Sequence, residues 1–296
     1  MSIEVRPLSH ALAAEVRGID LAKPVSDKDL ADIQAAWLRH LVLIFPGQKF
    51  SEERQIAFGR LFGQLDDHRA VPFYRIPEYP EIYQITNKHI GGKESQTKDT
   101  GRLWHSDHSF SLHPSLATML YCREIPPVGG TTMFANMYMA YDSLSDKYKQ
   151  MIDGLEAVHD LSHYLGINPY VRSRDQEQIA KIKALNPPVA QPIVRVHPET
   201  GKKALFVSEG QTTHIVGMSH AESRTILDHL FKISVTPEFT YRHNWTVDDM
   251  LMWDNRCTLH LALADYSHKD TRHMHRITVL GEACGRPLTA EELAAA

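Results

Sequence analysis

A histidine and an aspartate two positions apart, His105 and Asp107, are the residues whose types and spacing point most directly to chemistry. On an extended strand, side chains two positions apart project to the same face, so both could bind one metal ion. The His-x-Asp spacing is common, however, and a hydrogen-bonded pair on a strand explains it equally well. The pair therefore predicts a metal site only if a third ligand arrives from elsewhere in the chain.

His260 is the candidate for that third ligand. It ends the stretch Met252-Trp-Asp-Asn-Arg-Cys-Thr-Leu-His260, which follows a β-like run and could be delivered to the same place by a late strand. Two histidines and one carboxylate on one triangular face, with open positions opposite, are the ligands of non-heme Fe(II) oxygenases. The neighbouring His108 is expected to point away from the metal, because adjacent residues on a strand face opposite ways.

Two arginines, Arg272 and Arg276, indicate what else binds there. Because they are four positions apart on an extended strand, they share a face. Arginine holds a carboxylate through two hydrogen bonds, and a buried arginine without a counter-ion is unfavourable. Two inward-facing arginines beside a metal therefore predict two anions: the far carboxylate of a dicarboxylate co-substrate and an acidic group of the substrate. Arg276 alone could instead be an ordinary salt-bridged strand residue.

The composition is that of a chain able to bury a core. Of 296 residues, 43% are apolar and 23% charged, and no linker or repeat divides them, so we expect one domain over 1–296. The net charge of -4 argues against nucleic acid or an anionic membrane as a partner. The apolar runs are too short to span a bilayer, and no signal peptide is recognisable. Three scattered cysteines predict free thiols in a reducing cytoplasm.

The periodicity of apolar residues predicts an α+β fold. Helical spacing with capping residues indicates a helix that opens at 26–29 and carries Leu30, Ile33 and Trp37, and further helices over 51–62, 145–153, 175–185 and 219–233. Short alternating or apolar runs indicate strands within 3–18, 41–45, 81–85, 117–121, 131–134, 191–196, 203–207, 239–245, 250–253 and 273–280. Many short strands with helices gathered early and in insertions are typical of a β-sandwich or barrel. The polar region 66–98, broken by proline and glycine, predicts a mobile lid before the metal motif.

Six motifs spread along the chain carry a resemblance to a known family. They are Phe45-Pro-Gly-Gln48, Trp104-His-Ser-Asp-His-Ser-Phe110, Pro127-Val-Gly-Gly-Thr-Thr132, Phe206-Val-Ser-Glu-Gly210, Trp253-Asp-Asn-Arg256 and His275-Arg276. With them the chain resembles the Fe(II)/2-oxoglutarate-dependent dioxygenases, and among these the taurine dioxygenase and 2,4-dichlorophenoxyacetate dioxygenase family. The resemblance covers nearly the whole chain. It implies a double-stranded β-helix, or jelly roll, as the core, with flanking helices.

The resemblance also implies roles for the matching residues around the metal. His105, Asp107 and His260 would bind Fe(II). Thr132 and Arg272 would hold the far carboxylate of 2-oxoglutarate, which is consumed together with O2 and leaves as succinate and CO2.

On the substrate side, the resemblance implies that Arg276 holds an acidic group of the substrate. His68 matches a substrate-contacting histidine of the taurine enzyme, although a histidine in a lid-like loop is often a plain surface residue. Two positions depart from the family pattern. Gly101 stands where the taurine enzyme has a substrate-contacting asparagine, and Thr131 replaces the aspartate usual in the Gly-Gly-Asp-Thr turn, where its role is expected to be structural.

These features together predict a dioxygenase that hydroxylates a small anionic substrate, with an aryloxyalkanoate favoured. The alternatives inside the family are a taurine-like alkanesulfonate or an alkyl sulfate ester. The alternatives outside it are a metal-binding jelly roll without catalysis and a zinc hydrolase with the same three ligands. The enzyme is expected to act in the cytoplasm as a homodimer or homotetramer.

Overall fold

The computed structural model describes residues 3–68, 74–168, 180, 183–267 and 269–295. In these segments the strands are β1 (Glu4–Pro7), β2 (Ala14–Arg17), β3 (Val42–Phe45), β4 (Arg75–Ile76), β5 (Tyr79–Thr86), β6 (His89–Ile90), β7 (Lys93–Glu94), β8 (Ser115–Glu124), β9 (Thr132–Asn136), β10 (Glu156–His159), β11 (Val189–Pro192), β12 (Val194–Val196), β13 (Lys203–Leu205), β14 (Thr212–Ile215), β15 (Thr240–His243), β16 (Met250–Asp254), β17 (Thr258–Ala262), β18 (His273–Leu280) and β19 (Arg286–Pro287). The helices are α1 (Asp27–His40), α2 (Glu52–Arg60), α3 (Met137–Asp142), α4 (Asp146–Ile152), α5 (Leu161–Ile167), α7 (His220–Ser234) and α8 (Ala290–Ala295), with 3-10 turns η2 (Gln96–Asp99) and η3 (Pro237–Phe239).

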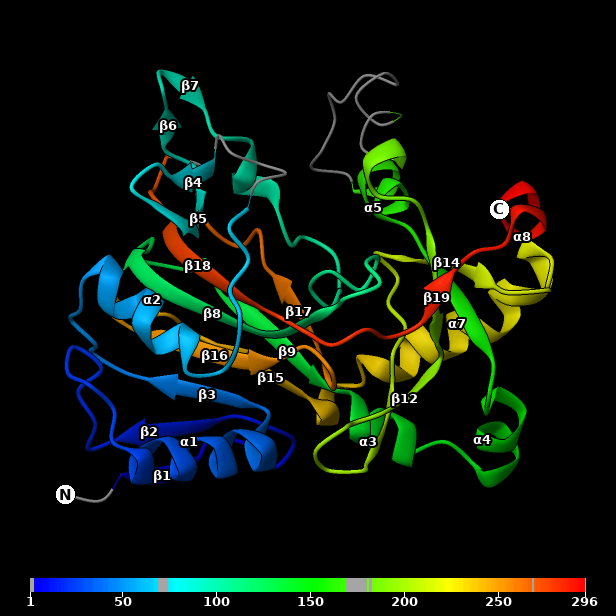
Figure 1. Cartoon of the computed structure of the whole chain (residues 1–296), viewed down its shortest axis with the longest axis horizontal. Helices are drawn as coiled ribbons and strands as arrows, with labels where there is room; N and C mark the ends of the chain where they lie inside the picture. Colours follow the sequence, from blue (N-terminus) through cyan, green and yellow to red (C-terminus); the bar gives the residue numbers. More distant parts are fainter. Residues whose placement is uncertain (1–2, 69–73, 169–179, 181–182, 268, 296) are drawn as a thin grey trace.

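The main sheet has eight strands in the order β1-β2-β3-β16-β8-β18-β5-β4 (Figure 1). Neighbouring strands are antiparallel except β2 and β3, which run parallel. Side chains alternate between the two faces of each strand. Along β18, Ile277 and Val279 pack into one hydrophobic cluster and Met274 into another, so the alternation puts Arg276 on the same face as Met274.

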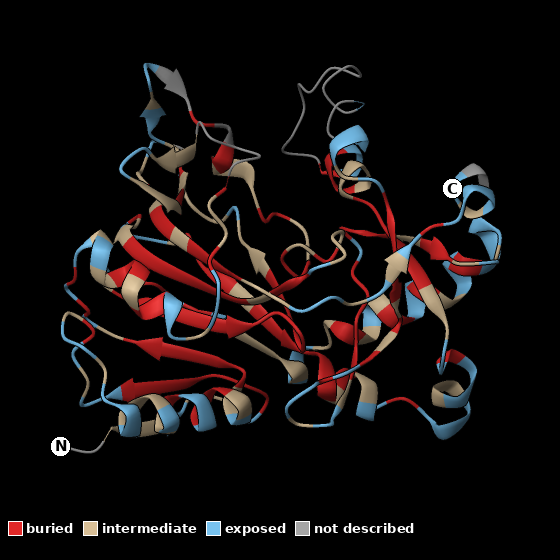
Figure 2. Cartoon of the chain, in the orientation of Figure 1, coloured by how far each residue is buried: buried red, intermediate tan, exposed pale blue. Residues whose placement is uncertain are grey.

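Helices α1 and α2 cover the outer face of the main sheet (Figure 1). The sequence forms α1 because Ser26 caps it, its side chain accepting a hydrogen bond from the Asp29 backbone N–H. Ile33, Ala36 and Trp37 recur at helical spacing and are buried against the sheet. In Figure 2 both helices are accordingly buried along one side and exposed along the other.

The inner face of the main sheet packs against a three-stranded sheet, β15-β9-β17. Phe134 of β9 contacts Trp253 of β16 across the interface, with ring centroids 5.3 Å apart. Among the described strands neither sheet closes on itself, so the core is a sandwich of two sheets rather than a barrel. A further sheet, β14-β10-β11-β19, and the hairpin β12-β13 extend the sandwich, and α7 packs beside β14.

The region 66–98 is more regular than an irregular lid. Its strand β5 belongs to the main sheet, where it pairs with β18. Ile82 and Tyr83 of this strand are buried. Strand β4, the β6-β7 hairpin and η2 account for most of the rest. Residues 69–73 of this region, and most of the helix expected over 175–185, lie outside the described residues.

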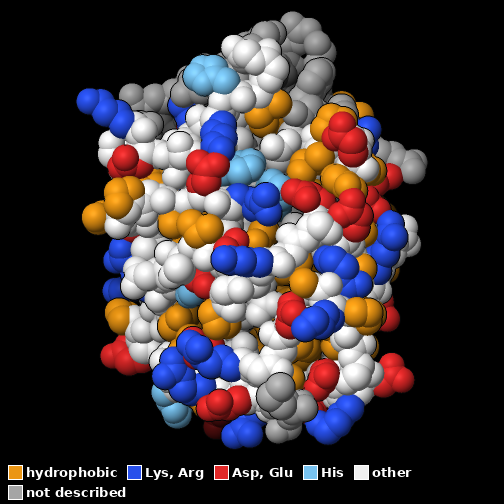
Figure 3. All heavy atoms as spheres, turned by 90° about the vertical axis from the view of Figure 1, so that its left-hand side faces the viewer, with side chains coloured by type: hydrophobic (Ala, Val, Ile, Leu, Met, Phe, Trp, Pro, Cys, Tyr) orange, Lys and Arg blue, Asp and Glu red, His pale blue; other side chains and the backbone are white. Residues whose placement is uncertain are grey.

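In the described segments no helix combines the length and apolarity that crossing a bilayer requires. On the face shown in Figure 3, lysines and arginines are mixed with aspartates and glutamates rather than gathered into one basic area. The three cysteines are all free thiols, and Cys122 and Cys257 are buried.

Candidate active site

A pair of backbone hydrogen bonds places His105 directly opposite His260 in an antiparallel bridge. The His105 N–H donates to the His260 carbonyl at 3.1 Å, and the His260 N–H donates to the His105 carbonyl at 2.9 Å. His260 is the middle residue of β17, so a late strand does deliver it. The two imidazole rings lie side by side, with centroids 4.1 Å apart.

Asp107 reaches the same place from a turn. His105 forms only one isolated bridge and residues 107–110 are a turn, so the expected strand carrying both His105 and Asp107 is wrong. His108 has a left-handed φ of 55°, and strand alternation therefore does not decide where its ring points. Burial and Arg276 lower the pKa of His108, and His108 is not part of the ligand cluster.

The three predicted metal ligands form one buried cluster. Asp107 Oδ1 lies 3.8 Å from His105 Nε2, and Asp107 Oδ2 lies 3.7 Å from His260 Nε2. All three ligand atoms lie within 4.8 Å of one another. Burial lowers the pKa of His260 to about 3, which leaves its ring neutral. Burial alone would raise the pKa of Asp107, but His260 and Arg276 hold it below its usual value. A carboxylate and two neutral imidazoles are the protonation states that bind a divalent metal.

The backbone orients one of the two imidazoles. His105 Nδ1 lies 2.7 Å from the Leu103 carbonyl, which can only accept, so Nδ1 carries the proton. The Nε2 lone pair is then free on the side of Asp107. Nδ1 of His260 has no hydrogen-bond partner among the described residues.

Two further residues, Thr118 and Asn255, hold the Asp107 carboxylate in place. Thr118 Oγ1 donates to Asp107 Oδ2 at 2.6 Å, and Asn255 Nδ2 donates to Thr118 Oγ1 at 2.9 Å. Asn255 Oδ1 accepts from the Asp107 backbone N–H at 3.2 Å and from Trp253 Nε1 at 3.1 Å. Sequence reasoning assigned neither Thr118 nor Asn255 a role. The only available signal was that Asn255 lies in the Trp-Asp-Asn-Arg motif.

Replacing Thr118 by valine should weaken metal binding while the fold is kept. Valine has the shape of threonine but removes the donor to Asp107 and leaves the Asn255 amide without its acceptor. Partners of metal ligands change metal affinity by about 10- to 100-fold. Mn(II) titration of Thr118→Val against Thr118→Ser, which keeps the hydroxyl, measures this effect. Equal affinities of the two variants would contradict it.

Arg272 is a buried cation without a carboxylate partner in the described part of the chain. It is 5% exposed, and burial lowers its pKa to about 10, so it stays charged at neutral pH. Its side chain donates from Nε to the Gly130 carbonyl at 3.1 Å. Close by, the Thr132 hydroxyl accepts from Trp245 Nε1 at 3.0 Å, which leaves its own proton to donate. An unmatched guanidinium and a free hydroxyl donor fit the far carboxylate of 2-oxoglutarate.

The turn that presents this pair is fixed by Asp265. Its Oδ1 accepts from the Gly130 N–H at 2.7 Å, and its Oδ2 accepts from Thr131 Oγ1 at 2.7 Å and from Arg242 Nη2 at 2.6 Å. A Cβ at Gly129 would lie 2.0 Å from the Asp265 carbonyl oxygen, so only glycine fits there. Thr131 is thus part of a structural turn. Asp265, distant in sequence, supplies the carboxylate that the family's usual aspartate at position 131 would provide.

Arg276 lies against the metal-ligand cluster. Its Nη1 is 3.4 Å from Asp107 Oδ1, and its guanidinium stacks 4.7 Å above the centroid of Tyr83, the residue opposite it in the β5-β18 register. The His68 ring is also packed on Tyr83, at 5.3 Å, and His68 is 3% exposed. Arg276 Nε and His68 Nε2 are buried without hydrogen-bond partners among the described residues. Sequence reasoning missed Tyr83, which nothing but cross-strand register would have identified.

Gly101 lies against His105 and has no side chain of its own. A Cβ placed there would lie 3.4 Å from His105 Cε1 and 3.6 Å from the Ala262 Cβ. The φ of 79° at Gly101 is a conformation that favours glycine. Any side chain at this position would lie against a metal ligand, whereas this chain presents none.

The fold and the cluster define a class: a jelly-roll-type protein with two histidines and a carboxylate arranged for a divalent metal. The family model described as "Taurine catabolism dioxygenase TauD, TfdA family" matches residues 4–278. The chain therefore belongs to the TauD/TfdA family.

Similar proteins cover almost the whole chain. An alpha-ketoglutarate-dependent 2,4-dichlorophenoxyacetate dioxygenase from Burkholderia sp. (strain RASC) is 34% identical over 96% of both chains. An alkylsulfatase from Acinetobacter baylyi (strain ATCC 33305 / BD413 / ADP1) is 32% identical over 95% of this chain and 86% of its own. The crystal structure of AAD-2 in complex with Mn(II) and N-oxalylglycine superposes with a TM-score of 0.84, at 33% identity, over 97% of this chain and all of that one.

These findings confirm several predictions. The α+β fold with a jelly-roll core agrees with the superposed family structure. The chain is a 2-oxoglutarate-dependent dioxygenase that uses Fe(II) and O2, which argues against a non-catalytic binding protein and against a zinc hydrolase.

Proposed function

We propose that this dioxygenase hydroxylates a small aryloxyalkanoate at the carbon that bears the ether oxygen. The observation that carries the proposal is the half-buried Arg276 side chain, 12% exposed, whose guanidinium lies beside Asp107 and whose buried Nε has no hydrogen-bond partner among the described residues. A substrate carboxylate would satisfy it. The relatives whose names specify 2,4-dichlorophenoxyacetate and (S)-phenoxypropionate support the choice of acid.

In this proposal His105, Asp107 and His260 hold Fe(II), while Arg272 and Thr132 hold the far carboxylate of 2-oxoglutarate. When bound, Fe(II) with 2-oxoglutarate and O2 supplies the oxidant for an unactivated C–H bond, and 2-oxoglutarate leaves as succinate and CO2. The hydroxylated ether carbon is a hemiacetal, and it collapses to a phenol and a 2-oxo acid.

The chain's own side chains determine where the substrate lies. Arg276 fixes one end of the substrate at its carboxylate, and the Tyr83 ring holds the guanidinium plane from behind. With its acid fixed on Arg276, the substrate turns the carbon next to its carboxylate toward the cluster, which is the orientation part of catalysis. His68 is neutral because burial and Arg276 lower its pKa to about 4, so it can hydrogen-bond the substrate without adding a second charge.

A second candidate substrate is an alkanesulfonate or an alkyl sulfate ester. Relatives named for sulfonate, alkyl sulfate and sulfate ester reactions support it, and an arginine binds a sulfonate as well as a carboxylate. Against taurine itself stands Gly101, which offers no polar side chain next to His105.

A substrate panel tests the proposal. Succinate formation under air with Fe(II) is followed for aryloxyacetates, alkanesulfonates and alkyl sulfates, together with released phenol, sulfite and sulfate. Phenol release is expected to dominate. Release of sulfite or sulfate alone would replace the aryloxyalkanoate by the second candidate.

Arg276→Gln should lower kcat/KM for the preferred acid by about 30- to 1,000-fold. This factor corresponds to the ~2–4 kcal/mol that is lost when one partner of a desolvated charge pair is removed. The neutral amide of the same acid is the matched control, because it has no charge for Arg276 to hold. The KM for 2-oxoglutarate should stay unchanged. An equal loss for acid and amide would mean that Arg276 acts on Asp107 rather than on the substrate.

We further propose a homo-oligomer acting in the cytoplasm on a free small molecule. Three free thiols fit a reducing compartment. The net charge of -4 and the mixed charges in Figure 3 disfavour nucleic acid as a partner.

A further inference from the structure

A pocket of about 460 Å³ lies away from the metal-ligand cluster, between the β12-β13 hairpin and the segment that follows β18. It contains none of the residues assigned above to metal, co-substrate or substrate. Much of its lining is apolar, from Leu116, Pro192, Val196, Pro198 and Ala283. Its charged lining residues are Arg195, Arg256, Glu199 and Glu282. Its volume is within the range of small-molecule sites.

Arg195 is the unusual member of this lining. It is 7% exposed, its Nη1 is buried without a hydrogen-bond partner, and none of its nitrogens forms an ion pair with a described residue. Its guanidinium rests on the face of Phe206, 4.8 Å from the ring centroid, which orients it but does not neutralise it. A buried charge without a counter-ion is strongly unfavourable, so this position favours an anion.

The other charges around the pocket are already matched or remote. Arg256 donates from Nε and Nη2 to Asp254, at 2.8 and 2.7 Å, and from Nη1 to Glu199 at 2.5 Å. Glu282 is exposed and does not come within ion-pair distance of Arg195. Burial raises the pKa of Cys284, so that its thiol stays protonated and supplies no charge. Among the described residues that line the pocket, the positive charge of Arg195 has no ion-pair partner.

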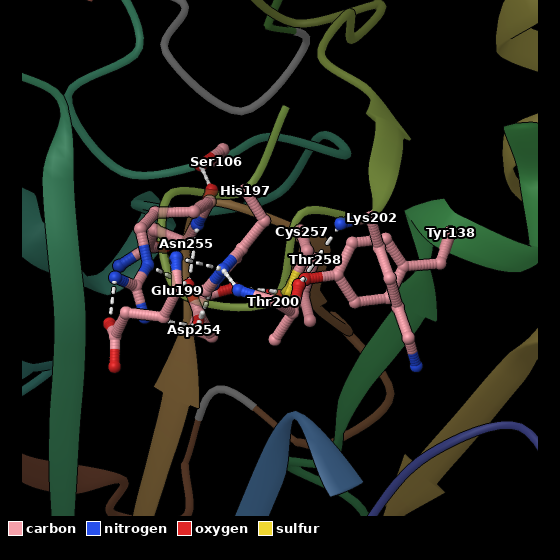
Figure 4. Close-up of polar contacts among 11 residues, drawn as sticks. Ser106, Tyr138, His197, Glu199, Thr200, Lys202, Asp254, Asn255, Cys257 and Thr258 are labelled. Atoms are coloured by element: carbon pink, nitrogen blue, oxygen red, sulfur yellow. Dashed lines mark hydrogen bonds and ion pairs between the residues drawn. The ribbon is translucent and has the colours of Figure 1, made fainter. Parts of the chain in front are cut away.

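Both carboxylate oxygens of Asp254, behind the pocket, already accept hydrogen bonds from Arg256 and His197, so neither is free to bind a metal. Figure 4 shows Asp254 beside His197, whose Nε2 donates to Asp254 Oδ2 at 3.0 Å. His197 Nδ1 accepts from the Glu199 and Thr200 N–H groups, each at 3.2 Å, so neither ring nitrogen is free. The cluster of His197, Asp254 and Cys257 is therefore structural, although its atoms are close enough for a metal.

We propose that this pocket binds a small organic monocarboxylate, with its carboxylate on Arg195 and its apolar body on Leu116, Pro192 and Val196. A single unmatched cation calls for a single negative charge. A dicarboxylate such as 2-oxoglutarate or succinate would bring its second charge near Glu199 and Glu282. An inorganic anion would leave the apolar lining without a partner.

The test uses 4-bromobenzoate and the full-length protein with Mn(II) and N-oxalylglycine bound. Arg276→Gln serves as the background, so that the probe does not bind at the proposed substrate arginine. The anomalous signal of bromine in soaked crystals should lie in the pocket beside Arg195. Calorimetric titration should give an affinity that falls about 10- to 100-fold in Arg195→Met, the loss of a charge-assisted hydrogen-bonded pair. The neutral 4-bromobenzamide should bind to the Arg276→Gln protein as weakly as 4-bromobenzoate binds when Arg195→Met is added to it.

Arg195→Met removes an unmatched charge and keeps an apolar side chain of similar length, so it should fold with unchanged or higher thermal stability. Bromine density absent from the pocket would overturn the proposal, as would equal affinity for the acid with and without Arg195. A third overturning result is a smaller oligomer of Arg195→Met by light scattering, because a carboxylate from a second copy would then be the partner of Arg195.

Discussion

Replacing His105 by alanine is expected to abolish the turnover of 2-oxoglutarate, whichever primary substrate is present. His105 supplies one of the three ligand atoms that lie within 4.8 Å of one another, and the Leu103 carbonyl orients its ring. Partners of metal ligands change affinity by about 10- to 100-fold, so loss of a ligand itself should exceed 100-fold. The residual pair of Asp107 and His260 leaves too few fixed ligands to hold Fe(II) at the concentrations used for assay.

Succinate formation and Mn(II) titration measure this effect in parallel. The matched control is His113→Ala, an exposed histidine from the same loop that does not belong to the ligand cluster. Its variant should retain both metal binding and turnover. Full succinate formation by His105→Ala, with metal bound, would remove the basis for the whole site.

Replacing Arg272 by methionine is expected to raise the KM for 2-oxoglutarate by about 30-fold or more. The guanidinium is buried and unmatched by any described carboxylate, so the co-substrate is its natural counter-ion. Truncating one partner of a buried charge pair weakens binding by about 2–5 kcal/mol. Arg272→Lys keeps the charge but not the planar two-donor geometry, and it should lie between the parent and Arg272→Met.

Thermal unfolding separates this role from a merely structural one. Without ligand, Arg272→Met should be as stable as the parent or more stable, because an isolated buried charge has been removed. The parent should gain stability with 2-oxoglutarate and metal by mass action, whereas Arg272→Met should gain much less. A variant that unfolds early without ligand but keeps its KM would show that Arg272 supports the turn at Gly130 instead.

The residues of the candidate site were predictable because their types are restricted. Few side chains bind a divalent metal or hold a carboxylate, and His105, Asp107, His260 and Arg272 stand in motifs of recognisable spacing. The alternation of apolar residues likewise predicted most of the strands, since a buried strand face leaves a period of two in the sequence. The same alternation assigned Asp107 to the strand of His105, and there the prediction was wrong, because one bridge followed by a turn achieves the same convergence.

Residues that act through another residue were not predictable. Thr118 and Tyr83 lie outside the metal motif, on other strands, and are ordinary in type. Their roles come from register: β8 presents Thr118 to Asp107, and β5 places Tyr83 opposite Arg276. Arg195 gave no signal either, because a lone arginine on a strand looks like a surface residue until its burial and missing partner are known.

By itself the sequence determined the reaction class, because the ligand types, their order and the family motifs can be recognised without knowing how the chain packs. Only the tertiary structure decided which neighbours hold those ligands, which arginines lack a counter-ion and how much space lies beside His105. These properties depend on which side chains meet across two sheets and on what water can no longer reach. Linear spacing does not encode them, because strand register and burial arise only when distant segments pack together.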